Sequence, residues 1–441
     1  MNRIILIGNG FDLAHGMPTS YQHFLDDFWK TAIEETLSNR DKDGNFDGDF
    51  FAVDKVPPYY QSDYTYKVFK EDCDTAGSQI TFKNRFLEII TNKSSIQNWV
   101  DIENEYYYLL KESYGDNTYS KDYKSVKVLN RDFSVIKDLL SEYLHKVQVE
   151  FSLLKKTEKT EKSQHQIGEK VYERFKWEDF SSVGVRNAAT REFERLEKVR
   201  VQDVDKLTPD LEDYLMELKQ IKNCGRLQPL LFDSRYQYEF DNIANATLLL
   251  NFNYTSTEQL YNDPFPFRTY KFVRKYQFAD TIHIHGSLDK SDNNPIIFGY
   301  GDELDDDYKQ LEKLNKNEYL DNIKSIKYLE TDNYKKLLEF IESDEYQVFI
   351  FGHSCGTSDR TLLNTLFEHD NCASIKPFYY KHKSEEDSEI YLDNYSDIVR
   401  NISRNFNSKV KFRDRVVNKT YCSPLLEICN HKPPAAKPSN I

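Results

Sequence analysis

The chain opens with Ile4-Ile5-Leu6-Ile7-Gly8-Asn9-Gly10, a short apolar run that ends in a glycine-rich turn. A continuous apolar run closed by glycine is typical of a parallel strand that is buried on both faces. A helix is expected soon afterwards, because Thr19-Ser20-Tyr21-Gln22 fits a capping box and apolar residues follow it at helical spacing. This stretch therefore predicts a strand, a glycine-rich loop and a helix, the beginning of an α/β fold.

Further apolar runs come after residue 247, with helical patterns between some of them. They cover residues 248–252, 281–285, 295–299, 347–352, 375–380 and 410–412. Strands that alternate with helices predict a mostly parallel, Rossmann-like, doubly wound α/β sheet.

The middle of the chain interrupts this alternation. Residues 1–40 are expected to give the first strand, loop and helix of the α/β core, and residues 241–415 the remainder of it. Residues 41–240 are expected to form a largely helical insertion, irregular over residues 40–80. Helical periodicity within it covers residues 83–92, 96–114, 131–155, 187–200 and 206–222. Residues 416–441 are expected to be a loose C-terminal tail.

Composition limits the classes of function. The chain has 441 residues and a formal net charge of −14, which disfavours non-specific binding to nucleic acid. Its six cysteines form no CxxC pair, so free thiols in a reducing compartment are expected and a structural metal is not. No apolar stretch reaches the length of a membrane span, and a cytoplasmic protein is predicted.

The turn Gly8-Asn9-Gly10-Phe11-Asp12 is the first candidate site. Backbone amides in a turn without side chains can approach a pyrophosphate, and the next helix adds partial positive charge. The dinucleotide fingerprint requires a third glycine where the chain has Leu13, so a plain strand–helix turn is the alternative. Gly16-Met17-Pro18 breaks the chain again before the helix, which indicates a loop shaped around a ligand.

Two polar clusters follow predicted strands. Asn251 and Asn253 project to the same side of a strand end, where open α/β sheets place ligands. An asparagine-rich turn with local hydrogen bonds is the alternative. His283 and His285 also share a face, and either a metal pair or acid–base work by His285 would suit them, with His283 as a core residue.

Gly352-His353-Ser354-Cys355-Gly356 matches the G-x-S-x-G nucleophile elbow and follows a strong strand. A serine hydrolase that uses Ser354 is therefore an alternative function, although the helix starts later than an elbow requires.

The predicted helix after Trp99 carries an acidic face. Asp101 or Glu105 could reach back over the nucleotide loop, and a solvated helix face is the competing interpretation.

These stretches together resemble the AbiH family of bacterial abortive-infection proteins, which are implicated in resistance to bacteriophage. The resemblance is most specific over residues 7–21 and extends in order to about residue 370. It also rests on Trp99-Val100-Asp101-Ile102-Glu103, Asn251-Phe252-Asn253-Tyr254-Thr255, His285-Gly286-Ser287 and Phe351-Gly352-His353-Ser354.

The same landmarks resemble a distant sirtuin-like core. Gly8-Asn9-Gly10 stands where sirtuins have G-A-G, and Asn253, His285 and Ser354 stand in their later NAD motifs. Asp12 replaces a sirtuin serine, and the four zinc cysteines are absent, so the resemblance does not imply a protein deacetylase. It implies a sirtuin-like NAD site of the kind found in phage-defence effectors that hydrolyse NAD.

The resemblance implies roles for individual residues. Asn253 and His285 would be catalytic, and NAD would be the ligand or substrate. Asp12 departs from the family pattern, and as a further catalytic candidate it could stabilise a cationic ribose or merely cap the loop. The residues implied to bind NAD are Gly8, Asn9, Gly10, Phe11, Pro18, Gly352 and Ser354, and Asp101 is a further candidate from the acidic helix face. The expected function is an anti-phage effector that hydrolyses NAD at the nicotinamide–ribose bond, alone, as a homo-oligomer or with a defence-system protein. A nucleotide-binding sensor or scaffold without turnover is the alternative.

Overall fold

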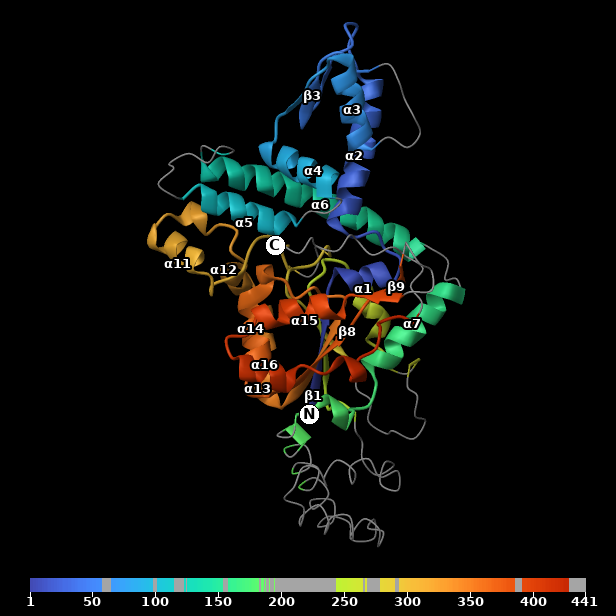
Figure 1. The fold of residues 1–441 in the computed structure, drawn as a ribbon, viewed down its shortest axis with the longest axis vertical. Coiled ribbons are helices and arrows are strands. Elements are labelled where there is room, and N and C mark those ends of the chain that lie inside the picture. The colour runs from blue at the N-terminus through green and yellow to red at the C-terminus, as the bar shows by residue number, and fades with distance from the viewer. Residues whose placement is uncertain are drawn as a thin grey trace.

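The core of the protein is a parallel sheet of five strands (Figure 1). In this computed structural model the strands are β1 Asn2–Ile7, β5 Thr247–Asn251, β6 Asp280–His283, β7 Tyr346–Phe351 and β8 Cys372–Phe378. Their order is β6-β5-β1-β7-β8, so the chain builds one side of β1 and then the other. This reversal makes a doubly wound sheet with its switch point between β1 and β7.

The structure describes most of the chain. The described residues are 1–57, 65–97, 101–114, 123, 125–153, 158–181, 184–185, 187, 190, 194, 243–264, 266–267, 278–289, 293–384 and 391–427. The helical patterns expected beyond residue 194, at 195–200 and 206–222, lie outside them.

Side chains of β1 alternate between two hydrophobic layers, which explains its uninterrupted apolar run. Ile4 and Leu6 pack in one layer, and Ile5 and Ile7 pack in the other. Burial of each such side chain stabilises the fold by about 1.5–3 kcal/mol. A strand with both faces covered can use apolar residues at every position, so the parallel arrangement follows from the sequence.

Helices cover both faces of the sheet. The layer of Ile4 and Leu6 also contains side chains of α13 Asn333–Ser343, α14 Arg360–Glu368 and α15 Tyr395–Arg404. The opposite layer contains side chains of α1 Asn9–Ala14, α7 Glu158–Val171 and the 3-10 segment η3 Thr257–Tyr261.

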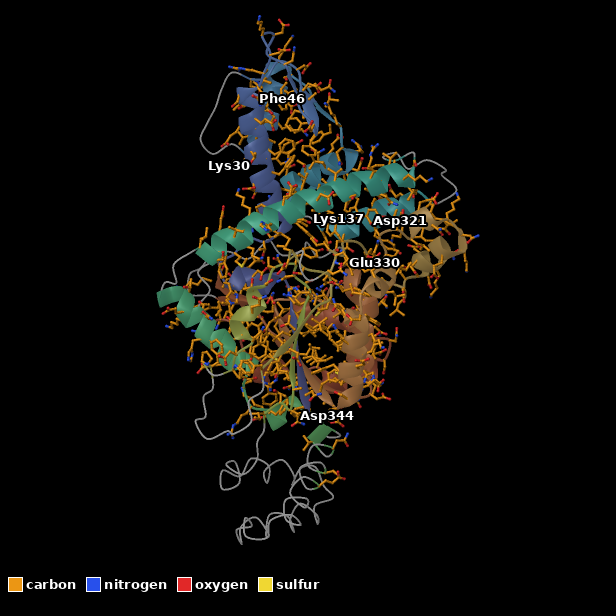
Figure 2. The ribbon with its side chains drawn as sticks, turned by 180° about the vertical axis from the view of Figure 1, so that it is seen from behind. Lys30, Phe46, Lys137, Asp321, Glu330 and Asp344 are labelled. Atoms are coloured by element: carbon orange, nitrogen blue, oxygen red, sulfur yellow. The ribbon has the colours of Figure 1, made fainter. Side chains whose placement is uncertain are left out.

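A helical layer covers the carboxyl edge of the sheet. It consists of α2 Tyr21–Ser38, α3 Tyr66–Ala76, α4 Arg85–Gln97, α5 Ile102–Glu112 and α6 Val126–Leu153. In Figure 2, Lys137 on α6 lies between Phe46 of the small antiparallel sheet and Asp344, which precedes β7. Tyr143 of α6 donates to the carbonyl of Pro18 at 2.6 Å, which joins this layer to the loop after α1.

Several expectations for secondary structure are wrong. Residues 410–412 belong to helix α16 Lys409–Arg415, because the Ser408 side chain caps it by accepting from the Lys411 amide. Residues 295–299 form no strand, although Ile297 N–H donates to the carbonyl of His285 at 2.8 Å. The supposedly irregular residues 40–80 contain α3 and most of an antiparallel sheet. Its strands are β2 Phe46–Asp47, β3 Phe51–Val53 and β4 Ile80–Phe82.

The remaining elements are short. They are α11 Asp306–Lys313, α12 Lys324–Lys327, η1 Trp177–Asp179, η5 Asn317–Tyr319, η6 Tyr328–Glu330, η7 Thr357–Asp359, η8 Lys419–Tyr421, β9 Lys381–Lys383 and β10 Tyr391–Asp393. The segment expected to be a loose tail is described as far as residue 427, and there Leu425 and Leu426 are buried against the sheet. Among the described helices, none has the length and apolar character needed to cross a membrane.

Candidate functional site

The candidate residues predicted from the strand ends gather at the carboxyl edge of the sheet. Ile7 of β1 is aligned with Asn251 of β5 on one side and with Phe351 of β7 on the other. Asn251 is in turn aligned with His283 of β6. The segments that follow these strands therefore start side by side at the switch point, where open α/β sheets bind ligands.

The two glycine loops at the switch point pack directly on each other. A Cβ on Gly10 would lie 2.8 Å from the Cα of Gly352, and one on Gly352 would lie 2.1 Å from the Phe11 nitrogen. The amide of Gly8 donates to the Phe351 carbonyl at 3.1 Å, and that of Gly10 donates to the Gly352 carbonyl at 2.9 Å. Contact between the loops thus explains these glycines, and both amides are already bonded within the protein.

The rest of the first loop has mixed roles. Asn9 is exposed, and its Oδ1 accepts from the hydroxyl of Thr19 at 2.6 Å. Phe11 is fully buried and packs with Tyr261 and Phe351, so its ring lies in the core. Of the residues expected to bind a ligand here, Asn9 presents a side chain to solvent and Phe11 does not.

Asp12 is a buried carboxylate beside this loop. It is 1% exposed, and its Oδ2 accepts from the Thr255 hydroxyl at 2.6 Å. Its Oδ1 is also buried, and no described residue hydrogen-bonds to it. Burial raises the pKa of Asp12 to about 6, although the side chains of Thr255, Thr257 and Asn253 act to lower it. These donors are neutral, so the ionised carboxylate is buried without a described cation to pair with it.

Asn253 connects the β5 end to the first glycine loop. Its Nδ2 donates to the Gly8 carbonyl at 3.1 Å, and its amide donates to Oδ1 of Asn251 at 2.8 Å. Asn251 also donates to a carboxylate oxygen of Glu258 at 2.7 Å. The local asparagine turn is therefore present, and it holds Asn253 against the predicted site.

The two histidines of β6 and its following turn have different partners. His283 Nε2 lies 3.0 Å from Oε1 of Glu258. His285 Nε2 lies 3.1 Å from Oδ1 of Asp359 and 3.2 Å from the hydroxyl of Tyr328. Burial lowers the pKa of His285 to about 4, so its imidazole is neutral at pH 7. The pair therefore does not converge on one ligand.

Asp359 is the centre of a buried charged network, here called the Asp359 network. Its Oδ1 lies 2.8 Å from Nζ of Lys324, and the same ammonium is 2.9 Å from Oε2 of Glu103. His353 Nε2 is 3.6 Å from the other oxygen of Asp359. Although burial acts to raise it, Lys324 and His285 hold the pKa of Asp359 well below its usual range. The network joins α5, α12 and the ends of β6 and β7.

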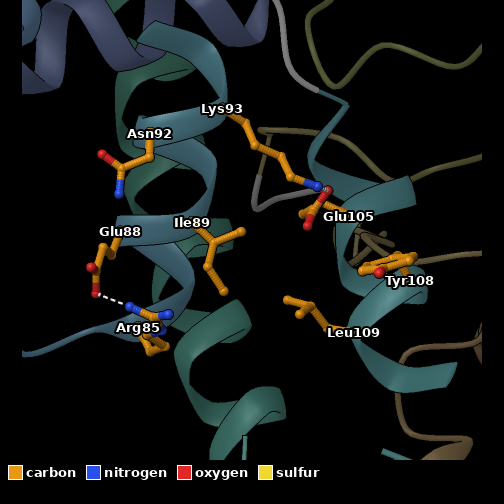
Figure 3. A pocket seen from close by; sticks show the side chains of 8 residues that line it. All are labelled: Arg85, Glu88, Ile89, Asn92, Lys93, Glu105, Tyr108 and Leu109. Atoms are coloured by element: carbon orange, nitrogen blue, oxygen red, sulfur yellow. Dashed lines mark hydrogen bonds and ion pairs between the residues drawn. The ribbon is translucent and has the colours of Figure 1, made fainter. Parts of the chain in front are cut away.

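The acidic residues of α5 point in different directions. Asp101 caps the helix, because its Oδ1 accepts from the Asn104 amide at 3.2 Å. Glu105 pairs with Lys93 of α4 in a pocket of about 380 Å³, which Figure 3 shows between the two helices. The third acid, Glu103, is the one that reaches the sheet edge. Trp99 and Val100 of the same motif lie outside the described residues.

The neighbouring His353 is not oriented to act as a general base for Ser354 in the nucleophile-elbow motif. His353 accepts from the Cys355 amide through Nδ1 at 3.0 Å and turns Nε2 toward Asp359. Both ring nitrogens are thus directed away from the exposed Ser354 side chain. Cys355 is fully buried, and burial raises the pKa of its thiol, so it is a poor nucleophile. This geometry does not favour the serine-hydrolase alternative.

Some residues of the site carried little signal in the sequence. Glu103 and Asp359 lie within or beside motifs that were recognisable, but their charges were not distinguishable from helix caps and solvated faces. Lys324 carried no signal, since its partner Glu103 is 221 positions away.

Comparison with known proteins extends over most of this architecture. A family model described as "Bacteriophage abortive infection AbiH" matches residues 4–381, which include both glycine loops and the Asp359 network. The curated proteins and the solved structures that were compared contain no match.

Proposed function

The chain belongs to the AbiH family of bacteriophage abortive-infection proteins, and on that premise we propose that it binds NAD at the carboxyl edge of its sheet and hydrolyses it. The observation that supports this most is the buried carboxyl of Asp12 after the first glycine loop, whose Oδ1 accepts no hydrogen bond from a described residue. Asn253 acts on the Asp12 carboxyl and donates to the Gly8 carbonyl, and the sheet is of the doubly wound type that binds nucleotides at its carboxyl edge.

Asp12 suits the charge that develops during this reaction. When the nicotinamide–ribose bond breaks, nicotinamide leaves with the bonding electrons and the ribose becomes cationic at C1′. A carboxylate already fixed in a dry site stabilises such charge without having to reorganise. Water then adds to C1′ and releases its proton, which gives ADP-ribose.

Asn253 and His285 would fix the sugar and the water. Asn253 is held by Gly8 and Asn251, so it is preorganised to orient a hydroxyl or water. His285 is neutral, and with a pKa of about 4 it accepts a hydrogen bond rather than a proton at pH 7. We therefore assign His285 to a ribose hydroxyl. The exposed side chains of Asn9 and Ser354 remain for the phosphates, because the Gly8 and Gly10 amides are bonded already.

Nicotinamide release from NAD by the purified full-length protein tests this function. We expect Asp12→Asn and Asn253→Ala to lower the rate at least about 100-fold, as loss of one transition-state contact commonly does. Asp414→Asn changes an exposed acid on α16 and serves as the matched control. Absence of release under every condition in which the protein protects cells from phage would disprove turnover.

A nucleotide sensor without turnover is the second candidate. It is favoured by the closed hydrogen bonding of the Gly8–Gly10 loop and by the weak basicity of His285. Calorimetry that detects NAD binding in a sample that releases no nicotinamide would support this candidate over hydrolysis.

A further inference from the structure

Glu103 connects the helical layer to the sheet edge through buried ion pairs. Its Oε2 is 2.9 Å from Nζ of Lys324, and that ammonium is 2.8 Å from Oδ1 of Asp359. The same oxygen of Asp359 is 3.1 Å from His285 Nε2. The Lys324 side chain has no exposed surface, and those of the other three are at most 10% exposed. A continuous chain of buried polar contacts thus connects helix α5 to His285 at the end of β6.

Lys324 forms ion pairs with two carboxyl groups whose pKa values are shifted in opposite directions. Burial raises the pKa of Glu103 to about 7, whereas Lys324 and His285 keep Asp359 ionised. Glu103 also accepts from the Gly299 amide at 3.1 Å, its second described hydrogen bond. Of the two carboxyls that Lys324 contacts, Glu103 is therefore held less firmly in its ionised form than Asp359.

On the outer side of α5, Tyr108 is exposed to solvent, whereas Glu105 and Leu109 are buried. All three line the pocket shared with α4 (Figure 3). Tyr108 is 50% exposed, and Lys93 lies 5.3 Å from its ring centroid. A change that acts on α5 from solvent can therefore reach the opposite, buried side of the same helix.

We propose that α5 regulates the sheet-edge site through the relay Glu103–Lys324–Asp359–His285. When Glu103 withdraws from Lys324, the ammonium turns wholly toward Asp359, and Asp359 loosens its hold on His285. The groups that face His285 in this relay are Lys324, Asp359, His353 and the hydroxyl of Tyr328. The biological meaning rests on the proposed function, but the relay itself requires no ligand.

Hydrogen exchange of the full-length protein, without NAD, tests the relay. In Glu103→Gln we expect amide exchange over residues 283–287 to rise at least about fivefold, the lower end of usual allosteric couplings. Glu105→Gln is the matched control, because Glu105 is also on α5, is also 8% exposed and pairs with Lys93 instead. Equal exchange in the two variants would overturn the proposal.

A double-mutant cycle separates the relay from general loss of stability. The effects of Glu103→Gln and Asp359→Asn on amide exchange over residues 283–287 should be non-additive. Those of Glu105→Gln and Asp359→Asn on the same segment should add. Additive effects in the first pair would also overturn the proposal. Should Glu103→Gln fail to fold, Glu103→Asp keeps the charge but withdraws it by one methylene, and the same segment should respond.

Nicotinamide release distinguishes the two proposals. If release is absent and the exchange pattern holds, hydrolysis fails and the relay stands. If release is present and residues 283–287 do not respond to Glu103→Gln, the relay fails and hydrolysis stands.

Discussion

Asp12 combines burial, an incomplete set of hydrogen bonds and a raised pKa. In the unfolded chain this carboxyl has its ordinary pKa of 3.8, and in the folded protein the value is about 6. The folded state therefore binds the proton more tightly. The stability that Asp12 contributes is fully present below pH 3.8 and is lost as the pH rises through 6. Above pH 6 the ionised group remains as a constant cost.

Asp12→Asn should therefore stabilise the protein more at high pH than at low pH. From the folded pKa of about 6, we expect the gain in unfolding free energy to be about 1 kcal/mol larger at pH 8 than at pH 5. Urea denaturation of the variant and the native protein at the two pH values measures this. Asp414→Asn should show no comparable difference, and an equal gain at both values would refute the assignment.

Substitutions of Gly352 and Gly16 distinguish the cost of a steric clash between loops from the cost of a left-handed backbone conformation. Both have positive φ, 70° and 83°, but a Cβ on Gly352 would collide with backbone, whereas one on Gly16 would meet nothing within 4 Å. Gly16→Ala should cost about 1–2 kcal/mol from its left-handed conformation alone. Gly352→Ala should cost at least about 3 kcal/mol, because overpacking is added.

Denaturant unfolding of the two glycine variants provides the comparison. Similar losses for Gly16→Ala and Gly352→Ala would show that the two switch-point loops separate at little cost. The close contact between Gly10 and Gly352 would then not be what holds this edge together.

At the scale of elements, Lys324 of α12 forms ion pairs with Glu103 of α5 and with Asp359, the N-cap residue of α14. Removing Lys324 leaves two buried carboxylates without a cation, so Lys324→Met should lower stability by about 3–5 kcal/mol. Lys327→Met is the control from the same helix, where the partly exposed pair with Glu330 at 2.9 Å should contribute about 0–1 kcal/mol. Thermal or urea unfolding of both variants measures these losses of stability. Comparable losses in Lys324→Met and Lys327→Met would contradict a central role for Lys324.

Prediction from sequence succeeded where structure is local. The strands β1, β5 and β7 each contain a continuous apolar run, which is typical of strands buried on both faces. It failed for Val410-Lys411-Phe412, whose alternation indicates a strand while the preceding Ser408 starts a helix. The Asp359 network could not be predicted, because its members meet only through tertiary packing, with Lys324 lying 35 positions from Asp359 and 221 positions from Glu103.

For the candidate site, the loops could be identified from the sequence, but the hydrogen bonds between them could not. Gly8, Asn253, His285 and Gly352 were expected at one edge, and the structure places them after aligned or neighbouring strands. The glycines suggested an open cradle for phosphate, whereas the two loops bond to each other. Hydrogen bonding between distant loops depends on their docking, which a single sequence does not encode in any short pattern.

At the scale of the whole molecule, the helical layer lies over the sheet edge where the proposed ligand binds (Figure 1). Tyr143 bonds to Pro18, Gln148 accepts from the Ser256 amide at 2.9 Å, and Glu103 pairs with Lys324. The layer thus contacts the loop after α1, the loop after β5 and α12. These contacts are the route by which the proposed regulation through α5 would act on the proposed site.

Isothermal titration of the full-length protein with ADP-ribose tests the nucleotide site most directly, because it does not depend on turnover. We expect saturable binding to the native protein and a loss of at least about tenfold in affinity, or about 1.4 kcal/mol, in Asn253→Ala. Asp414→Asn should bind as the native protein does. No binding to the native protein, or equal binding to Asn253→Ala, would contradict a nucleotide site at the carboxyl edge of the sheet.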